Sequence, residues 1–318
     1  MKKLIAAALC IVMLAGLLSA CGSHEEADSD LHIITTIFPI YDWVNEILGD
    51  TGNAEVTLLL DSGVDLHNYQ LTADDMIQIS SCDVFLYVGG ESDAWVEDAL
   101  AGAVNENMIV INLLEVLGDK AKEEEVVEGM QSEQEEHGEA EYDEHVWLSL
   151  KNAAFFCRYI AERLGEAAPE SRAVYERNAA AYADRLSALD AEYQQAADGA
   201  PRNTVLFGDR FPFRYLMDDY GLEYYAAFSG CSAETEASFE TITFLAGKVD
   251  ELNLAAILQI ESSDGSIPDT IRQSTAAKNQ EILTMDSMQS TTAEDVAGGV
   301  TYLAVMENNL GILRQALK

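Results

Sequence analysis

The middle of the chain reads PESRAVYERNAAAYADRLSALDAEYQQAADG, from Pro169 to Gly199. Apolar or small side chains recur along it, at Val174, Ala181, Leu186, Leu189 and Tyr193. Pro169 suits a first helical turn and Gly199 a C-terminal stop, so the pattern predicts one helix over residues 169–199. At 1.5 Å per residue this helix extends roughly 45 Å, which is long for a single domain. We interpret it as a rigid spine that joins two lobes.

Short β-branched or aromatic runs alternate with helical patterns on both sides of this stretch. The predicted strands are residues 32–37, 55–60, 84–88 and 108–112 before it, and 204–208, 223–227, 255–260 and 281–285 after it. Segments 40–48, 73–79 and 95–103 have helical patterns. The alternation predicts an α/β lobe on each side, over residues 31–168 and 200–318.

The N-terminus has the pattern of an export signal. Lys2 and Lys3 precede an apolar stretch of about 15 residues, too short for an easy membrane span, so residues 1–20 are predicted to be a signal peptide. Small residues stand before Cys21, in the order of a bacterial lipobox, which predicts lipidation of Cys21. Residues 21–30 then form a polar tether to a membrane surface.

Size and charge narrow the class of protein. The chain beyond the signal exceeds the length at which a single core usually stops growing, which also favours two lobes. The formal charge of −38 becomes −40 without the signal, since Lys2 and Lys3 are the only charged residues there. Such a field repels nucleic acid and attracts cations.

Residues 119–144 are strongly acidic. They contain 12 Asp or Glu residues, two lysines, one histidine and almost no large apolar groups. Because such a segment buries little apolar surface, it is predicted to be a mobile loop, either a solvated insertion or a collector of cations. Its one histidine, His137, could hand a metal ion onward, although a single histidine supports this weakly.

Two histidines are the candidates for metal binding. His67, in GVDLHNY (63–69), follows a predicted strand end and a turn, and ligands collect at such edges of α/β sheets. His145 closes the acidic segment and begins HVWL (145–148). No nucleophile elbow, phosphate-binding loop or His-Glu-x-x-His helix occurs, so the sequence predicts a protein that is not an enzyme.

Several motifs together resemble those of a known family. They are ITTIFPI (34–40), GVDLHNY (63–69), residues 83–90, HVWL (145–148) with Lys151 and Asn152, YGL (220–222) and ESS (261–263). In this order they resemble the metal-binding solute receptors of bacterial ABC importers for zinc and manganese, the zinc-uptake receptor family of cluster A-I. The resemblance covers essentially the whole mature chain.

The resemblance implies two α/β lobes bridged by a rigid helix, with one metal ion in the cleft between them. Family ligands usually come as two from each lobe: two histidines, a third His or Glu, and an Asp. His67 and His145 match the first two positions. Asp286, in ILTMDS (282–287), matches the last.

The third ligand departs from the family pattern. The expected position falls on Arg210, which offers only hydrogen-bond donors and is not expected to bind a cation. Asp209 is our substitute, and Glu261, after the strand 255–260, is the alternative. Asp209 and Arg210 could instead pair with each other or with a neighbouring carboxylate, leaving water, Glu144, Glu234 or Glu261 to complete the site. Cys231 as a thiolate ligand is a further alternative that nothing in the family pattern supports.

The predicted function is capture of a divalent metal ion outside the cytoplasm and delivery to an ABC permease for import. Two imidazoles with carboxylates suit Zn²⁺ or Mn²⁺, and the acidic segment favours Zn²⁺. The resemblance implies a monomer, lipid-anchored on the outer face of the cell membrane, with no nucleic-acid partner. The alternatives are a metal-dependent surface adhesion lipoprotein and a secreted zinc hydrolase with Glu144 or Glu261 as its base.

Cys10 lies in the predicted signal peptide and Cys21 is the predicted lipidation site, which leaves three other cysteines. Cys82, Cys157 and Cys231 lack paired spacing, so at most one disulfide could form, or all three could be buried thiols.

Overall fold

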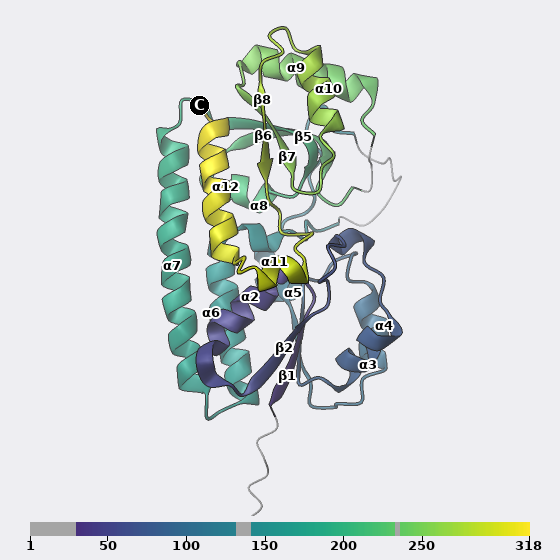
Figure 1. Ribbon diagram of the computed structural model, residues 1–318, viewed down its shortest axis with the longest axis vertical. Helices are drawn as coiled ribbons and strands as arrows, with labels where there is room; N and C mark the ends of the chain where they lie inside the picture. The colour runs from purple at the N-terminus through teal and green to yellow at the C-terminus, as the bar shows by residue number, and fades with distance from the viewer. Residues whose placement is uncertain (1–29, 132–140, 233–235) are drawn as a thin grey trace, which may run out of the picture. The chain divides into compact units, whose positions relative to one another are not determined.

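The chain folds into two parallel sheets of four strands each, covered by helices (Figure 1). The computed structural model describes residues 30–131, 141–232 and 236–318. The first sheet contains β1 (Leu31–Thr35), β2 (Ala54–Leu58), β3 (Val84–Tyr87) and β4 (Ile109–Asn112). The second contains β5 (Thr204–Phe211), β6 (Glu223–Ser229), β7 (Ala256–Ile260) and β8 (Glu281–Met285). Each strand overlaps a predicted run, and the two-lobed α/β class is confirmed.

Both sheets have the same kind of topology. The strand order is β2-β1-β3-β4 in the first and β6-β5-β7-β8 in the second. The first strand of each sheet therefore has later strands on both sides, and the chain reverses direction beside it. Ligands of parallel sheets collect outside the carboxyl ends of the strands at such a reversal. This is the edge from which most of the candidate site is built.

Most helices lie between consecutive strands. In the first half these are α2 (Phe38–Leu48), α3 (Ala73–Ser81), α4 (Trp95–Ala101) and α5 (Leu113–Leu117), followed by α6 (Leu150–Ala167). In the second half they are α8 (Arg214–Tyr220), α9 (Phe239–Leu252) and α10 (Ser266–Ser274), followed by α11 (Ala293–Ala297) and α12 (Tyr302–Ala316).

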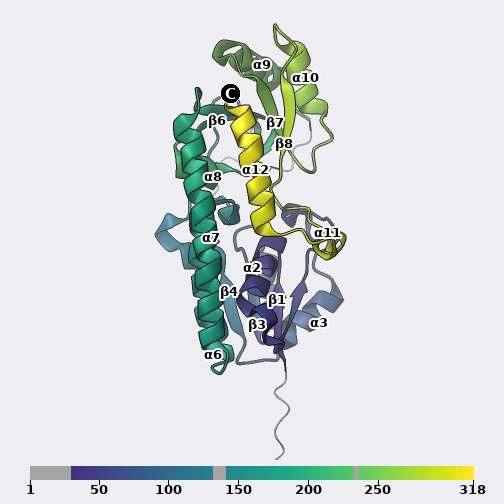
Figure 2. The ribbon, with the colours of Figure 1, turned by 60° about the vertical axis from the view of Figure 1, so that its left-hand side comes forward.

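The long helix between the sheets is α7 (Arg172–Gly199). It ends at the predicted Gly199 but begins after Pro169, because Pro169 and Glu170 form the turn from α6. Helix α7 packs against α6 and α2, and also against α12 (Figure 2). There the buried Tyr193 hydroxyl donates to the Met306 carbonyl oxygen at 2.7 Å. Because α12 also contacts α2, the lobe boundaries at residues 168 and 200 stay a prediction.

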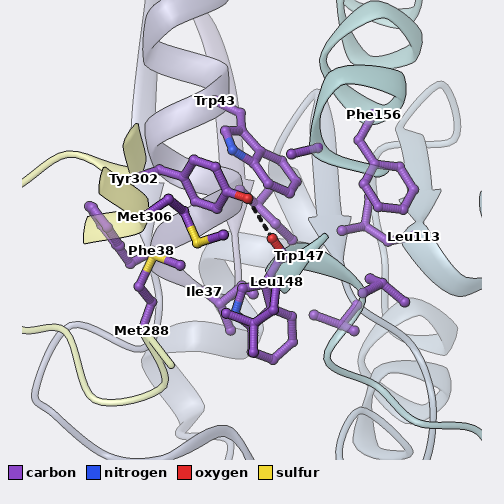
Figure 3. Packing of buried hydrophobic residues seen from close by; sticks show 14 of the residues in the cluster. Ile37, Phe38, Trp43, Leu113, Trp147, Leu148, Phe156, Met288, Tyr302 and Met306 are labelled. Carbon is purple, nitrogen blue, oxygen red and sulfur yellow. Dashed lines mark hydrogen bonds between the residues drawn. The ribbon is translucent and has the colours of Figure 1, made fainter. Parts of the chain in front are cut away.

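A cluster of fully buried aromatic side chains joins the first lobe to the C-terminal helix (Figure 3). The Trp43 ring lies edge-on to Tyr302, with centroids 5.2 Å apart. The Tyr302 hydroxyl donates to the Trp147 carbonyl oxygen at 2.6 Å, and Trp147 Nε1 donates to the Ser287 carbonyl oxygen at 2.9 Å. Trp147 is thereby fixed from both sides, two residues after His145.

The described parts of the acidic segment, residues 119–131 and 141–144, contact helix α8 and each other, and the mobility of the segment stays a prediction. Lys122 N donates to the Tyr215 hydroxyl at 2.8 Å, and Arg214 pairs with Glu125 at 3.5 Å. Glu123 forms an isolated bridge with Tyr142. The contacts of this segment with α8 are thus a hydrogen bond and an ion pair, as its polar composition would suggest.

Several predictions fall outside the described residues. These are the signal peptide, Cys21 and nearly all of the tether, together with His137 and Glu234. Among the helices that are described, none combines the length and the apolar character required to cross a membrane. Cys82, Cys157 and Cys231 are free thiols.

Candidate metal centre

His67 lies in a short 3-10 helix, Leu66–Asn68, in the segment after β2. Its backbone N–H donates to Asp65 Oδ1 at 3.0 Å, so Asp65 caps the turn that presents the imidazole. His67 Nδ1 lies 2.7 Å from Ser92 Oγ. The Ser92 backbone N–H in turn donates to Glu144 Oε1 at 2.9 Å, so Ser92 connects His67 to this buried carboxylate. In the tautomer that carries its proton on Nδ1, with Ser92 Oγ as acceptor, His67 presents the Nε2 lone pair to a cation.

His145 is fully buried at the start of a second 3-10 helix, Val146–Leu148. Asp143 Oδ1 accepts from both the backbone N–H and Nδ1 of His145, each at 2.9 Å. A carboxylate that accepts from one ring nitrogen fixes the tautomer and strengthens the other nitrogen as a ligand. His145 thus presents Nε2 as an unprotonated donor, as His67 does.

The two free nitrogens converge. His67 Nε2 and His145 Nε2 are 3.3 Å apart. In a tetrahedral zinc site with Zn–N bonds of about 2.05 Å, two nitrogens are separated by roughly 3.3 Å. The two Nε2 atoms therefore have the spacing of two ligands of one metal ion.

Gln289, in the segment after β8, also reaches this point. Its side-chain nitrogen lies 3.1 Å from His67 Nε2 and 2.9 Å from His145 Nε2. The Gln289 side chain is nearly buried, and its oxygen accepts from the Ser287 hydroxyl at 3.0 Å. The sequence prediction missed Gln289. The predicted ligand Asp286 lies in the same segment, but a single glutamine belongs to no recognisable metal-binding motif, so the sequence did not indicate Gln289.

Cys231 completes a cluster of possible metal ligands. Among the described residues, ligand atoms of His67, His145 and Cys231 all lie within 4.8 Å of one another. Cys231 follows β6, so it comes from the second lobe. A cavity of about 360 Å³ is lined by Asn68 and Ser232, the neighbours of His67 and Cys231. The sequence offered Cys231 only as an alternative that the family pattern did not support.

The structure does not bring Asp209, Asp286 or Glu261 into that cluster. Asp209 Oδ1 accepts from the N–H of Arg210 at 2.8 Å. Asp286 Oδ1 accepts from the N–H of Met288 at 2.8 Å. Glu261 accepts from the N–H groups of Ser287 and Gln289 at 2.8 and 3.2 Å. Asp209 and Asp286 thus accept from the backbone close by, whereas Glu261 holds the segment after β8 from a distance of 26 to 28 residues. A ligand role for any of the three stays a prediction.

Arg210 pairs with a carboxylate across the two lobes, as one sequence alternative expected. Its Nη2 lies 2.6 Å from Asp65 Oδ2, and both side chains are largely buried. Burial acts to raise the pKa of Asp65, but the Arg210 guanidinium outweighs it and lowers that pKa below its usual value. Asp65 also caps the His67 turn. The Arg210 guanidinium, at the position where a metal ligand was expected, therefore supports the candidate ligand His67 through Asp65.

The electrostatics of the site favour a neutral imidazole beside an excess of carboxylates. Burial, with a further contribution from His145, lowers the pKa of His67 to about 3. Glu144 lies 3.7 Å from His67 Nδ1, and its Oε2 is buried without a hydrogen bond. Burial raises the pKa of Glu144, and it raises the pKa of the nearby Asp93 to about 7. The low pKa of His67 means that its imidazole is neutral at neutral pH, the form that binds a metal ion.

The fold consists of two α/β lobes joined by a long helix, and the two imidazoles of the first lobe face a segment of the second. This arrangement is that of a two-lobed solute-binding protein with a candidate metal centre. The chain belongs to the family of the zinc-uptake complex component A, periplasmic, whose family model matches residues 33–316. The resemblance inferred from the sequence motifs is confirmed.

Individual relatives agree with this assignment. The chain is 32% identical to the zinc-binding lipoprotein AdcA of Streptococcus pneumoniae serotype 4, over 99% of this chain and 61% of the relative. It is 28% identical to the high-affinity zinc uptake system protein ZnuA of Bacillus subtilis, over 98% and 96% of the two chains. It therefore spans 61% of the length of that AdcA.

A solved structure agrees as well. The Zn(II)-bound ZnuA-like domain of S. pneumoniae AdcA matches with a TM-score of 0.71 and 28% identity. The match covers 91% of this chain and 99% of that one.

Proposed function

We propose that this protein captures Zn²⁺ outside the cytoplasm and delivers it to an ABC permease for import. The observation that carries the proposal is the pair of Nε2 atoms 3.3 Å apart, with a hydrogen-bond partner at each Nδ1: Ser92 Oγ for His67 and the Asp143 carboxylate for His145. Membership in a zinc-uptake family supports the same function. A capture protein requires a preorganised site, and this arrangement supplies one.

Zinc suits this site better than manganese. The imidazole spacing equals that of a four-coordinate zinc centre, whereas manganese prefers more oxygen ligands. The relatives named above are zinc-binding or zinc-uptake proteins, and the similar AdcA domain was solved with Zn(II). Manganese is the alternative cargo.

The site residues come from both lobes, which suggests how the metal ion is released. His67 and His145 precede α7, whereas Gln289 and Cys231 follow it. A small movement of one lobe would separate the two sets and open the site. The Asp65–Arg210 pair crosses the same boundary at 2.6 Å, so it would be broken or strained by that movement.

Metal-binding measurements test the proposal. His67→Ala and His145→Ala are each expected to weaken zinc binding by 100-fold or more, because each removes an imidazole ligand, and outer-shell changes alone cost about 10- to 100-fold. Isothermal titration calorimetry with competing chelators would measure this. His32→Ala is the matched control, because His32 is exposed on β1 and pairs only with Glu55, at 3.8 Å. Unchanged affinity in both site variants would overturn the assignment.

The cellular context belongs to the same proposal. We expect lipidation at Cys21, attachment to the outer face of the cell membrane, a monomeric state and a membrane permease as partner. Cys21→Ser is expected to move the protein from the membrane fraction to the soluble fraction without changing its affinity for zinc. The adhesion and hydrolase alternatives stay predictions of the sequence.

A further inference from the structure

Cys231 lies against the histidine pair because the turn after β6 packs directly on His145. A Cβ atom placed on Gly230 would be only 2.8 Å from His145 Cε1, so this position has no room for a side chain. The next residue is held from the other side, where its backbone N–H donates to Glu124 Oε1 at 3.0 Å. The Cys231 sulfur is thereby fixed within 4.8 Å of a ligand nitrogen of each imidazole.

We propose that Cys231 is the third ligand of the metal site, binding the same ion as His67 and His145 through its thiolate sulfur. The inference rests on the proposed function and specifies it: a site with two nitrogens and one sulfur selects Zn²⁺ and other thiophilic ions over Mn²⁺. It also accounts for Arg210, because the second lobe supplies its ligand from the turn after β6 instead of from β5.

The geometry requires only a small adjustment. With a Zn–S bond of about 2.3 Å and Zn–N bonds of about 2.05 Å, sulfur and nitrogen in a tetrahedral site are roughly 3.6 Å apart. The sulfur lies within 4.8 Å of one ring nitrogen of each histidine, so relative to those nitrogens it has to move by about one ångström. The turn after β6 would have to supply this movement when the metal ion binds.

The chemistry balances without a further reactant. Before metal arrives the sulfur is a thiol, and burial together with Glu144, Glu124 and Asp143 raises its pKa. When the S–metal bond forms, the S–H bond breaks and the proton leaves to solvent, as for other thiolate sites. The carboxylates that disfavour a bare thiolate favour the divalent cation that replaces the proton.

Cobalt spectroscopy of the purified full chain tests the proposal. Co²⁺ is expected to give a near-ultraviolet sulfur-to-cobalt charge-transfer band in the wild type. The band should disappear in Cys231→Ser and persist in Cys82→Ala, the matched control, whose thiol is buried in the first lobe. Zinc affinity should fall by at least the 10- to 100-fold that outer-shell changes cause in Cys231→Ser, but stay within a few-fold in the control.

The outcomes separate the two proposals. A wild-type protein that binds Zn²⁺ and Co²⁺ tightly without the charge-transfer band would overturn the role of Cys231 and leave the capture function standing. A wild-type protein that binds neither ion would overturn both. As a second variant, Cys231→Asp replaces sulfur by oxygen, so its preference for Zn²⁺ over Mn²⁺ should shrink; an unchanged preference would contradict the thiolate assignment.

Discussion

Asp65 connects the His67 turn of the first lobe to Arg210 of the second. One of its oxygens caps the His67 turn at 3.0 Å, and the other accepts from Arg210 at 2.6 Å. Because a carboxylate has two oxygens, it can hold a ligand loop and an interlobe ion pair at once. Arg210, at the position where the resemblance predicted a ligand, thus has a structural role of its own.

Arg210→Met is therefore expected to act on stability and on metal binding together. Removing one partner leaves Asp65 largely buried and unpaired, which should lower the free energy of unfolding by about 2 to 4 kcal/mol. Zinc affinity should fall roughly 10-fold or more, because the His67 turn loses its support. Chemical denaturation and calorimetry would measure both effects.

Arg185→Met is the control for this prediction. Arg185 pairs with Glu46 at 3.4 Å, but its side chain is 54% exposed, so the loss should be small. If Arg210→Met behaved like Arg185→Met in both measurements, the support of His67 through Asp65 would be refuted.

At this scale the sequence predicted two residues of the candidate site, His67 and His145, because motifs around them resemble a family pattern. It offered Cys231 only as an alternative and did not select Gln289, since a single thiol and a single amide have no spacing pattern. They approach the histidines only because segments from both lobes meet, and that is a tertiary property.

At the scale of elements, Asp42 connects three helices. It lies in α2, and its Oδ2 accepts from the Tyr182 hydroxyl of α7 at 3.2 Å and from the N–H of Tyr302, the first residue of α12, at 3.1 Å. Burial, only partly offset by these hydrogen bonds, raises the pKa of Asp42 to about 6. The charged form is therefore disfavoured in the folded protein.

This shift has a definite sign for stability. Between the ordinary pKa of about 3.9 and the folded value of about 6, the folded state binds more protons than the unfolded state. The contribution of Asp42 is present at low pH and is lost as pH rises through about 6, by about 3 kcal/mol in total. Asp42→Asn keeps an acceptor oxygen but does not titrate.

The stability of Asp42→Asn relative to wild type should therefore increase between pH 4 and pH 6 and stay constant above, by an amount of about 3 kcal/mol. Urea denaturation at several pH values would measure the difference. Parallel stability curves for the two proteins would contradict it.

The elements themselves were largely predictable, but their order was not. Strand runs such as 281–285 are recognised by local composition, and β8 occupies the same residues. Placing β1 between β2 and β3 depends on pairing between segments far apart in the chain, which local patterns do not encode. The start of α7 was missed because Pro169 suits a turn as well as a first helical turn.

At the scale of the whole molecule, a metal ion held by both lobes should stabilise the fold. A ligand that binds only the folded state adds about 2.7 kcal/mol at a concentration 100 times its Kd. For a chain of this size that corresponds to a rise in Tm of roughly 5 °C or more. The effect should grow with free zinc concentration in thermal melts of the wild type.

His145→Ala is the comparison for this measurement. It removes the buried imidazole, so zinc should raise its Tm much less than that of the wild type, whatever its own starting stability. An equal rise in both proteins would mean that zinc stabilises the fold from another place.

The contact between Tyr302 and Trp147 also limits when the site can form. These residues are 155 positions apart, and their hydrogen bond fixes the backbone beside His145. A chain that emerges N-terminus first presents both histidines long before α12 exists. Since α12 begins at Tyr302, the centre reaches its final geometry only after the chain has been delivered as far as this helix. The order of synthesis therefore sets when the site can form. A nascent chain, or one truncated before α12, would contain both histidines but not the hydrogen bond that fixes the backbone beside His145.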